Sequence, residues 1–205
     1  PTRISFYDKA TISLINSDQF EKGMAWDGDK VRVWKQMQRD EYYYGFGEKT
    51  GTLEKTGYTL ENWNTDIPAY KSDQDPLYKS IPFFIAIRKG DAYGIFFDNN
   101  YKTYFDVGKE KKNVLSFGAD GGELNYYFIN GPTPKDVSKN FAKLTGTMPL
   151  PPKWALGYQQ SRWSYYPESK VREIAETFRK KKIPCDVIYL DIHYMDGYRC
   201  FTWDK

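Results

Sequence analysis

The sequence predicts an antiparallel β-sandwich that is followed by the beginning of a parallel α/β domain. Residues 1–130 hold short apolar stretches separated by Gly, Asn and Asp turns, a spacing typical of a sandwich. Residues 153–191 read as strand, helix and strand, and such a βαβ unit has parallel strands joined by a right-handed crossover. The proline-rich residues 148–152 lie between these two regions. The predicted fold class is therefore β followed by α/β.

The strands of the first region are predicted from alternating apolar residues and from the turns between them. Short early strands are indicated by the pairs Ile4 and Phe6, Ile12 and Leu14, and Val31 and Val33. Longer strands are expected at residues 42–48, 81–87, 93–97, 101–107, 113–117 and 123–129. Residues 49–80 are polar and rich in turn residues, and so long an irregular stretch is expected to bind something or to be disordered.

A helix is predicted for residues 133–145, at the end of the β region. Thr133 is a suitable N-cap, Pro134 fits the first turn, and Gly146 can adopt the backbone conformation that ends a helix. The apolar stripe of this helix consists of Val137, Phe141 and Leu144. The stripe is expected to cover one face of the preceding sheet.

A domain boundary is expected near residue 148. Pro149, Pro151 and Pro152 predict a stiff linker, because proline fixes its own backbone φ angle. The sandwich domain should therefore comprise residues 1–147, with its terminal helix at 133–145, and the second domain residues 148–205.

The second domain is predicted to begin with a βαβ unit. Residues 155–160 are a short strand candidate. Between residues 168 and 182 the apolar residues recur with a helical period, and Pro184 ends the helix. Residues 187–190 form a nearly continuous apolar run, as expected of a strand that is covered on both faces.

Polar side chains follow both strands of this unit at the point where each strand ends. Arg162 and Trp163 come after the first strand, and Asp191 comes after the second. Ligands bind at the carboxyl ends of parallel strands in α/β architectures, so these three side chains are expected to meet there. A carboxylate accepts hydrogen bonds from hydroxyl groups, and an indole packs against a C–H face. The sequence therefore predicts a polyhydroxylated ligand.

Composition excludes several other functions. The net charge of +3 is small and the basic residues are scattered, which argues against a nucleic-acid partner. Two cysteines give no disulfide framework, a single histidine makes a zinc site improbable, and no cofactor is predicted. No apolar run approaches the roughly 20 residues of a membrane span, so no membrane partner is expected. The aromatic content of 18% provides many stacking surfaces, although aromatic packing in a β core explains most of them.

Four segments carry a resemblance to a known family. They are Tyr-Gly-Phe-Gly-Glu at 44–48, Asn-Thr-Asp at 64–66, the run from Pro-Pro-Lys-Trp at 151 to Ser-Arg-Trp at 163, and Asp-Val-Ile-Tyr-Leu-Asp-Ile-His-Tyr-Met at 186–195. In this order they resemble glycoside hydrolase family 31, which comprises retaining α-glucosidases and α-xylosidases. The resemblance implies a galactose-mutarotase-like sandwich followed by the first βαβ portion of a (β/α)8 TIM barrel.

The resemblance also implies roles for four substrate-binding residues. Asp191 is similar to the carboxylate that binds hydroxyl groups of the reacting sugar, Ile192 to the apolar wall beside it, and Trp163 to an aromatic lining of the same subsite. Asp66 is similar to a residue on a sandwich loop that shapes the substrate entrance. Plainer alternatives exist for each: a helix cap or a pair with Arg162 for Asp191, core packing for Trp163, and an Asx turn for Asp66.

The catalytic carboxylates of the family have no counterpart in this sequence. A retaining glycosidase needs a nucleophile and an acid/base about 5–5.5 Å apart, and the family motifs that supply them are expected beyond Lys205. Asp191 and Asp196 are not interpreted as this pair, because the resemblance makes Asp191 a binding residue, and His193 is interpreted as a packed side chain. The chain is expected to be the first part of an enzyme, inactive without the remainder of its barrel.

The predicted function is α-glucosidase activity, the release of terminal α-linked glucose from oligosaccharides with retention. Ile192 favours a six-carbon sugar, because it leaves space for the hydroxymethyl group, whereas His193 departs from the aspartate usual in the family's glucosidases. Two alternatives stay open. One is an α-xylosidase or α-glucan transglycosylase of the same family, and the other is a non-catalytic carbohydrate-binding sandwich.

Overall fold

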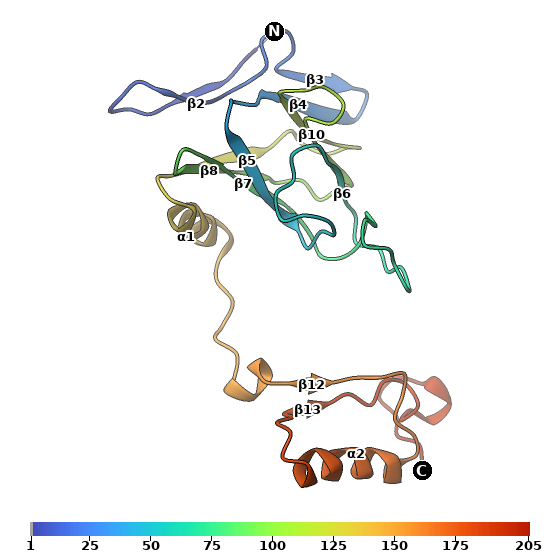
Figure 1. Cartoon of the computed structure of the whole chain (residues 1–205). Coiled ribbons are helices and arrows are strands. Elements are labelled where there is room, and N and C mark those ends of the chain that lie inside the picture. Colours follow the sequence, from blue (N-terminus) through green and yellow to red (C-terminus); the bar gives the residue numbers. More distant parts are fainter. Residues whose placement is uncertain (1) are drawn as a thin grey trace. The chain divides into compact units, whose positions relative to one another are not determined.

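The computed structural model describes residues 2–205 and divides the chain into two compact units, Pro1–Thr147 and Met148–Lys205. The first unit is built from antiparallel sheets and one long helix, and the second from one helix and two short parallel strands (Figure 1). Among residues 2–205, no helix combines the length and the apolar character needed to cross a bilayer.

The first unit is a sandwich of a five-stranded and a four-stranded sheet, both fully antiparallel. The five-stranded sheet contains, in spatial order, β3 (Met24–Asp27), β4 (Lys30–Gln36), β10 (Val114–Ala119), β9 (Thr103–Val107) and β6 (Thr59–Asn62). The four-stranded sheet contains β11 (Tyr126–Gly131), β8 (Asp91–Phe97), β7 (Ser80–Arg88) and β5 (Glu41–Gly47). A separate ribbon pairs β1 (Ser5–Tyr7) with β2 (Leu14–Ser17).

The two sheets enclose an aromatic core. Phe84 on β7 is fully buried, and its ring lies 5.1 Å from that of Phe46 on β5 and 6.2 Å from that of Phe105 on β9. Alternate residues of each strand point into this layer, as the pleat requires. Val31 and Val33 of β4, for example, are buried while Arg32 between them faces outward. Core packing thus explains only part of the aromatic content, fewer residues than expected, because five of the six tryptophans are exposed: Trp26, Trp63, Trp154, Trp163 and Trp203.

The Tyr-Gly-Phe-Gly-Glu motif forms an irregular end of β5. The pairing of β5 with β7 shifts between Gly45 and Gly47, and Phe46 between them has a φ of 66° and is buried. Gly47 has a φ of 89°, and a Cβ there would lie 2.2 Å from the carbonyl oxygen of Lys79. Only glycine fits such a position, since the conformation and the close backbone approach both exclude a side chain. The bulge turns Phe46 into the core.

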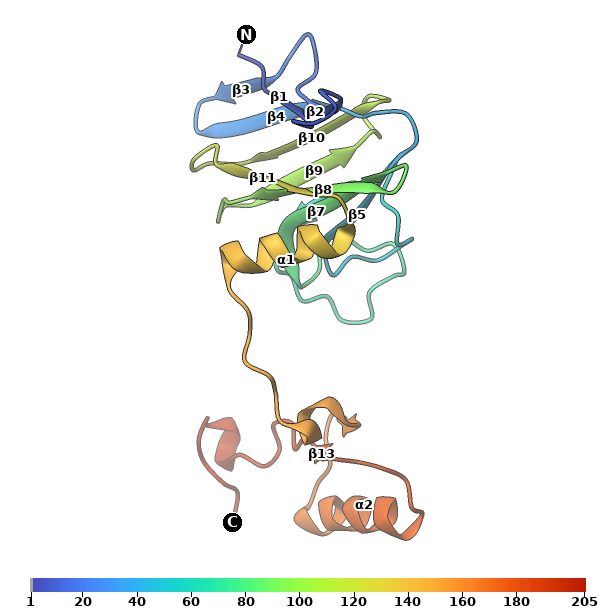
Figure 2. The same cartoon turned by 90° about the vertical axis from the view of Figure 1, so that its left-hand side faces the viewer.

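Helix α1 (Pro134–Thr145) covers the outer face of the four-stranded sheet (Figure 2). The Thr133 side chain accepts a hydrogen bond from the backbone N–H of Asp136, and Gly146 ends the helix with a φ of 87°. Val137 is fully buried, and Phe141 stacks on Phe83 of β7 with ring centroids 4.0 Å apart. The predicted caps and the first two residues of the predicted stripe are confirmed, whereas Leu144 is exposed.

Two strands of the sandwich were absent from the sequence prediction. β6 lies within residues 49–80, which were expected to be irregular, and it pairs with β9 at the edge of the five-stranded sheet. β3 forms the opposite edge and pairs only with β4. An edge strand with one neighbour needs little apolar alternation of its own, because its partner supplies the register.

The second unit corrects the predicted strand lengths. Residues 155 and 156 belong to a 3₁₀ turn, Lys153–Leu156, in which the N–H of Ala155 donates to the carbonyl of Pro152 at 2.9 Å. The paired strands are only β12 (Gln159–Gln160) and β13 (Val187–Ile188), and they are parallel as predicted. Helix α2 (Glu168–Lys180) lies between them in the sequence, and a short 3₁₀ turn, Asp196–Tyr198, follows.

The second unit also lacks the interior that the sequence suggested. The strand at 187–190 was expected to be covered on both faces, but Val187 and Ile188 are only half-buried. Across residues 148–205, all of which the structure describes, Cys185 is the one buried residue. Covered strands need neighbours on both sides of the sheet, and two strands with one helix supply only part of them.

Candidate active site

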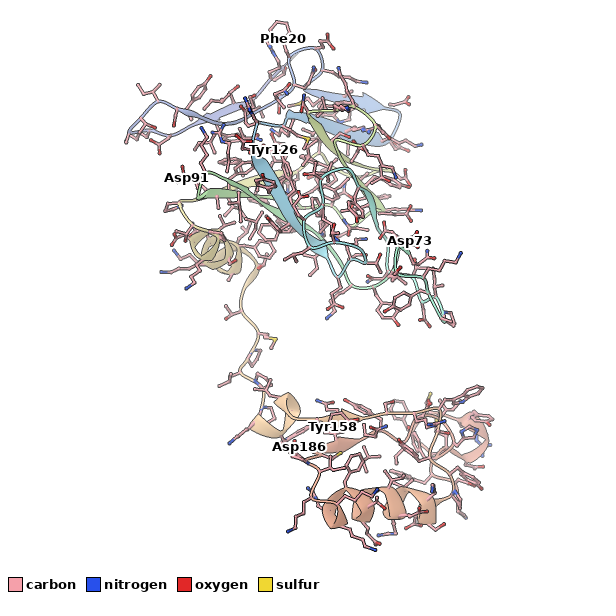
Figure 3. All side chains as sticks on the ribbon, in the orientation of Figure 1. Phe20, Asp73, Asp91, Tyr126, Tyr158 and Asp186 are labelled. Carbon is pink, nitrogen blue, oxygen red and sulfur yellow. The ribbon has the colours of Figure 1, made fainter. Side chains whose placement is uncertain are left out.

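The candidate site lies at the carboxyl ends of β12 and β13. Gln160 pairs with Ile188 in the parallel register, and the N–H of Tyr189 donates to the carbonyl of Gln160 at 2.9 Å. Trp163 follows Gln160 by three positions, and Asp191 follows Ile188 by three. The two side chains therefore leave the same end of the strand pair at matching steps. Figure 3 labels Tyr158 and Asp186, which mark the opposite, amino ends of the same strands.

A side-chain hydrogen bond ties the two segments together beyond the strands. The Ser164 hydroxyl and Nδ1 of His193 form this bond, with the donor set by the histidine tautomer. Ser164 is the immediate neighbour of Trp163, and His193 lies two residues after Asp191. On the Trp163 side, the Gln160 side-chain amide donates to the Tyr165 hydroxyl at 2.8 Å. The bond between Ser164 and His193 holds the indole-bearing and carboxylate-bearing segments side by side, and the bond between Gln160 and Tyr165 fixes the first segment internally.

Asp191 presents an uncommitted carboxylate. The residue is exposed and has a φ of 61°, a left-handed conformation that is uncommon for residues other than glycine. Among residues 2–205, its carboxylate has neither a hydrogen-bond donor nor an ion-pair partner, so the alternative of a pair with Arg162 is not observed. Strained backbone conformations of this kind gather at functional sites. The carboxylate is thus free to accept hydrogen bonds from a ligand.

Trp163 and Ile192 provide apolar surface beside that carboxylate. Trp163 is 79% exposed, so no element within residues 2–205 packs it into a core. Ile192 directly follows Asp191 and is also exposed. An open indole, an aliphatic side chain and a free carboxylate form a surface suited to a sugar, whose rings carry both C–H faces and hydroxyl groups.

His193 and Asp196 are committed to contacts within the unit. Besides its bond to Ser164, the His193 ring lies 5.7 Å from the ring of Tyr198. Asp196 forms an ion pair with Arg199 in the following turn. These contacts agree with interpreting His193 as a packed side chain and with leaving Asp196 out of a catalytic pair.

Asp66 lies in the first unit, on the loop between β6 and β7. The Tyr78 hydroxyl donates to the Asp66 carboxylate at 3.1 Å, and this bond together with the carboxylate's charge raises the pKa of Tyr78. On the same loop, the Asn64 side-chain oxygen accepts from the backbone N–H of Ser80 at 2.8 Å. The Asp66 carboxylate therefore bonds across the loop and not to its chain neighbours, as an Asx turn would require.

The part of the chain that the structure describes contains no cluster of three or more metal-ligating side chains. The residues gathered at the candidate site are suited to hydrogen bonding and stacking.

Comparisons with known proteins agree with this geometry. A sequence model described as the glycosyl hydrolase 31 N-terminal galactose mutarotase-like domain matches residues 1–106. A second, the glycosyl hydrolases family 31 TIM-barrel domain, matches residues 148–205. The chain belongs to glycoside hydrolase family 31. The predicted family and the predicted fold class, a sandwich followed by the start of a TIM barrel, are both confirmed.

Family 31 relatives resemble the chain over all or most of its length. Alpha-glucosidase 2 of Bacillus thermoamyloliquefaciens is 53% identical over 100% of this chain and 26% of its own length. An alpha-glucosidase of Saccharolobus solfataricus is 42% identical over 86% of this chain and 25% of its own. The solved structure of a Flavobacterium johnsoniae family 31 dextranase, complexed with isomaltotriose, superposes with a TM-score of 0.91 at 46% identity, covering 98% of this chain and 24% of that one. The chain therefore spans about a quarter of the length of these relatives.

Sequence reasoning missed two residues that bond to the segments of the candidate site residues. Ser164 and Tyr78 were not singled out, although Ser164 holds the segment after Asp191 and Tyr78 holds Asp66. The available signal was weak, since one serine beside a tryptophan and one tyrosine in a polar loop are common features. Both roles depend on residues that lie far apart in the sequence.

Proposed function

We propose that this chain is part of a retaining glycoside hydrolase that releases terminal α-linked glucose from oligosaccharides. The single observation that carries the proposal is the placement of Trp163 and Asp191. An exposed indole and an unpartnered carboxylate leave the carboxyl ends of two paired parallel strands. That edge is where TIM-barrel enzymes bind substrate. The alpha-glucosidases among the relatives support the choice of an α-glucoside.

Each proposed binding residue has a defined part. Asp191 accepts hydrogen bonds from hydroxyl groups of the reacting glucose, and Trp163 packs against its C–H face. Ile192 forms the wall beside the sugar and leaves space for its hydroxymethyl group. Asp66, held by Tyr78, shapes the substrate entrance from the sandwich domain.

The proposed reaction proceeds through a covalent glycosyl-enzyme intermediate. Retention requires a nucleophilic carboxylate and an acid/base carboxyl group about 5–5.5 Å apart. Neither Asp191 nor Asp196 takes these parts, because one binds substrate and the other is paired with Arg199. The two reacting groups are proposed to come from the remainder of the barrel, which is also the partner that this chain needs.

Replacing Asp191 in the full-length enzyme tests the assignment. Asp191→Ala is expected to lower kcat/KM by about a hundredfold or more, because removal of a hydrogen bond that strengthens in the transition state costs at least that much. Asp191→Asn keeps the shape and removes the charge, so it should lose activity as well. Asp186→Ala is the matched control, because Asp186 is an exposed aspartate at the amino end of the same strand (Figure 3). Near-normal turnover by Asp191→Ala would rule out the assignment.

The same assay separates the alternatives. Turnover of nitrophenyl α-glucoside in preference to the α-xyloside is expected from Ile192, although one hydroxymethyl group is worth only about 1–3 kcal/mol. A preference for the xyloside would indicate an α-xylosidase, and transfer to a sugar acceptor would indicate a transglycosylase. Binding without turnover of either substrate would indicate a non-catalytic carbohydrate-binding protein.

A further inference from the structure

A hollow of about 500 Å³ opens at one end of the sandwich, where β6 runs into the loop that leads to β7. Its walls come from the end of β6, the beginning of β7 and the connection from β8 to β9. All of these elements belong to the first unit. The volume is within the usual range of small-molecule sites, about 300–1,000 Å³.

Three residues that line this hollow carry buried polar atoms without partners. Asn62 and Thr103 face each other in the register of β6 and β9, and they are 5% and 1% exposed. Among the described residues, neither the nitrogen nor the oxygen of the Asn62 side-chain amide has a hydrogen-bond partner, and the hydroxyls of Thr103 and Ser80 also have none. All three residues line the hollow. Buried polar groups are nearly always hydrogen-bonded, so such a cluster calls for an occupant.

Two exposed aromatic side chains stand at the rim. Trp63 is 53% exposed and Tyr101 is 57% exposed. The Tyr101 ring is held against the chain at Gly121, where an added Cβ would lie 2.8 Å from the ring. Asn99 fixes the same corner, because its side-chain nitrogen donates to the carbonyl of Gly121 at 2.9 Å and its oxygen accepts from the N–H of Tyr101 at 2.8 Å. The rim is therefore organised before any ligand arrives.

The lining carries almost no charge. Asp98 is the one charged residue among the lining residues, and its carboxylate already accepts from the Asn125 side chain at 3.2 Å. The buried groups without partners are one amide and two hydroxyls, which donate as well as accept hydrogen bonds. Such a set does not select an ion. It complements a neutral ligand whose hydroxyl groups both donate and accept, with an apolar face for the aromatic rings.

We propose that this hollow is a carbohydrate-binding site of the sandwich domain that takes a pyranose unit of a neutral glycan. With its buried side chain turned toward the hollow, the Asn62 amide would bond adjacent hydroxyl groups of the sugar, with its nitrogen donating and its oxygen accepting. Thr103 and Ser80 supply further bonds, and Trp63 and Tyr101 pack against the sugar rings. The choice of an α-glucan as the glycan rests on the proposed function.

A larger hollow in the same unit provides a contrast and a control. It covers the outer face of the five-stranded sheet and includes the exposed Trp26. Some of its charged groups are paired: Arg32 with Glu110, and Asp75 with Lys49 of the neighbouring loop. No buried polar atom without a partner is found among the described residues that line it. It therefore gives no comparable reason to expect a sugar.

The test is a calorimetric titration of the full-length protein carrying Asp191→Ala, with maltotriose and isomaltotriose as probes. The Asp191→Ala change removes the carboxylate proposed to hold sugar at the barrel. Saturable binding is expected to persist in the Asp191→Ala protein. Adding Trp63→Ala or Tyr101→Ala should weaken this binding about tenfold or more, whereas adding Trp26→Ala should leave it unchanged. Thr103→Val is the decisive variant. It deletes an unpartnered hydroxyl at constant size, so it should weaken binding without lowering Tm.

Three outcomes would overturn the proposal: no saturable binding of either trisaccharide, loss of binding with Trp26→Ala but not with Trp63→Ala, or unchanged binding by Thr103→Val. Turnover by the enzyme with Asp191 intact is measured in parallel. An active enzyme whose Asp191→Ala form binds no trisaccharide contradicts the hollow alone. An inactive enzyme whose Asp191→Ala form binds sugar through Trp63 contradicts the proposed catalytic function alone.

Discussion

In the first unit the apolar faces of two sheets meet each other, whereas in the second unit one helix and two short strands leave most of their apolar side chains in solvent. Phe46, Phe84 and Phe105 are buried between the sheets. In the second unit Trp163 is open, and Phe201 is 99% exposed. Large exposed apolar surfaces mark places where another part of a protein binds. The sandwich thus contains its own core, whereas the βαβ segment presents apolar side chains that no element within residues 2–205 covers.

Separating the two units is the strongest test of this difference in core packing. Residues 1–147 alone are expected to unfold in one cooperative transition with heat, because their core is internal. Residues 148–205 alone are expected to show no cooperative transition, since Cys185 is their only buried residue. Circular dichroism and calorimetry measure both. A sharp transition in the second piece would show that it has an interior of its own.

Core truncation sharpens the comparison within the intact 205-residue chain. Phe84→Ala is expected to lower the free energy of unfolding of the first unit by about 3–5 kcal/mol, the usual cost of removing a buried phenylalanine. Phe178→Ala on α2 should cost less than about 1 kcal/mol, because Phe178 is only half-buried. Denaturant titrations that find equal losses would contradict the contrast between the units.

Backbone strain at the β5 bulge gives a smaller effect. Gly47→Ala should destabilise the first unit by about 3 kcal/mol, because it combines a left-handed conformation with a clash against the Lys79 carbonyl. Gly57→Ala is the matched control, since Gly57 has a φ of 83° but a Cβ there would meet nothing within 4 Å. The control isolates the conformational cost, about 1 kcal/mol. Equal values for the two variants would mean that the close approach at Gly47 is relieved at no cost.

The smallest expected effect is a pH dependence of the sandwich core. Burial, and secondarily the Glu41 charge, raises the pKa of Tyr93, whose hydroxyl accepts from the Asn16 side chain at 3.0 Å. Because the pKa of Tyr93 is higher in the folded state than in the unfolded state, the unfolded chain loses its phenolic proton first as the pH rises. The contribution of the Tyr93 hydroxyl to the free energy of unfolding is therefore complete below pH 10 and is lost above it, by about 1.4 kcal/mol per pH unit. The stability difference between the parent and Tyr93→Phe should therefore shift in favour of Tyr93→Phe above pH 10.

Alkaline denaturation of both proteins measures this difference directly. Using a difference is important, because burial lowers the pKa of Lys35 and so makes stability rise with pH up to the unfolded value of 10.5. Lys35 is present in both proteins, and its contribution cancels. A parent-to-variant difference that stays constant from pH 9 to about pH 11 would contradict the expected titration.

The elements of the fold that the sequence predicted are those whose conformation is determined by residues close together in the chain. The long central strands β7 and β8 and the helix α1 carry their period, turns and caps in adjacent residues. The edge strands β3 and β6 escaped prediction, because their conformation is imposed by β4 and β9, which are distant in sequence. Of the strand predicted at 155–160, only Gln159 and Gln160 are confirmed, since local turn bonds at Ala155 form without any partner strand.

The sequence predicted those features of the candidate site that follow from the strand topology alone. Parallel strands place whatever follows them at a common edge, and Trp163 and Asp191 follow the two strands at equal steps. The left-handed backbone of Asp191 and the bond between Ser164 and His193 depend on how two distant segments settle against each other. The unpartnered Asn62 likewise becomes visible only when its surroundings are known.

The position of α1 has a consequence for synthesis. β11 supplies one edge of the four-stranded sheet and α1 covers its outer face, and both come last in the sandwich. A ribosome that has translated only the earlier strands therefore displays an unfinished sheet, with Phe83 and Phe96 open to water and to chaperones. Once residue 145 has left the exit tunnel, the nascent domain can close while barrel strands are still being made. A pause in translation before that point would prolong the exposure, whereas a pause after it would not.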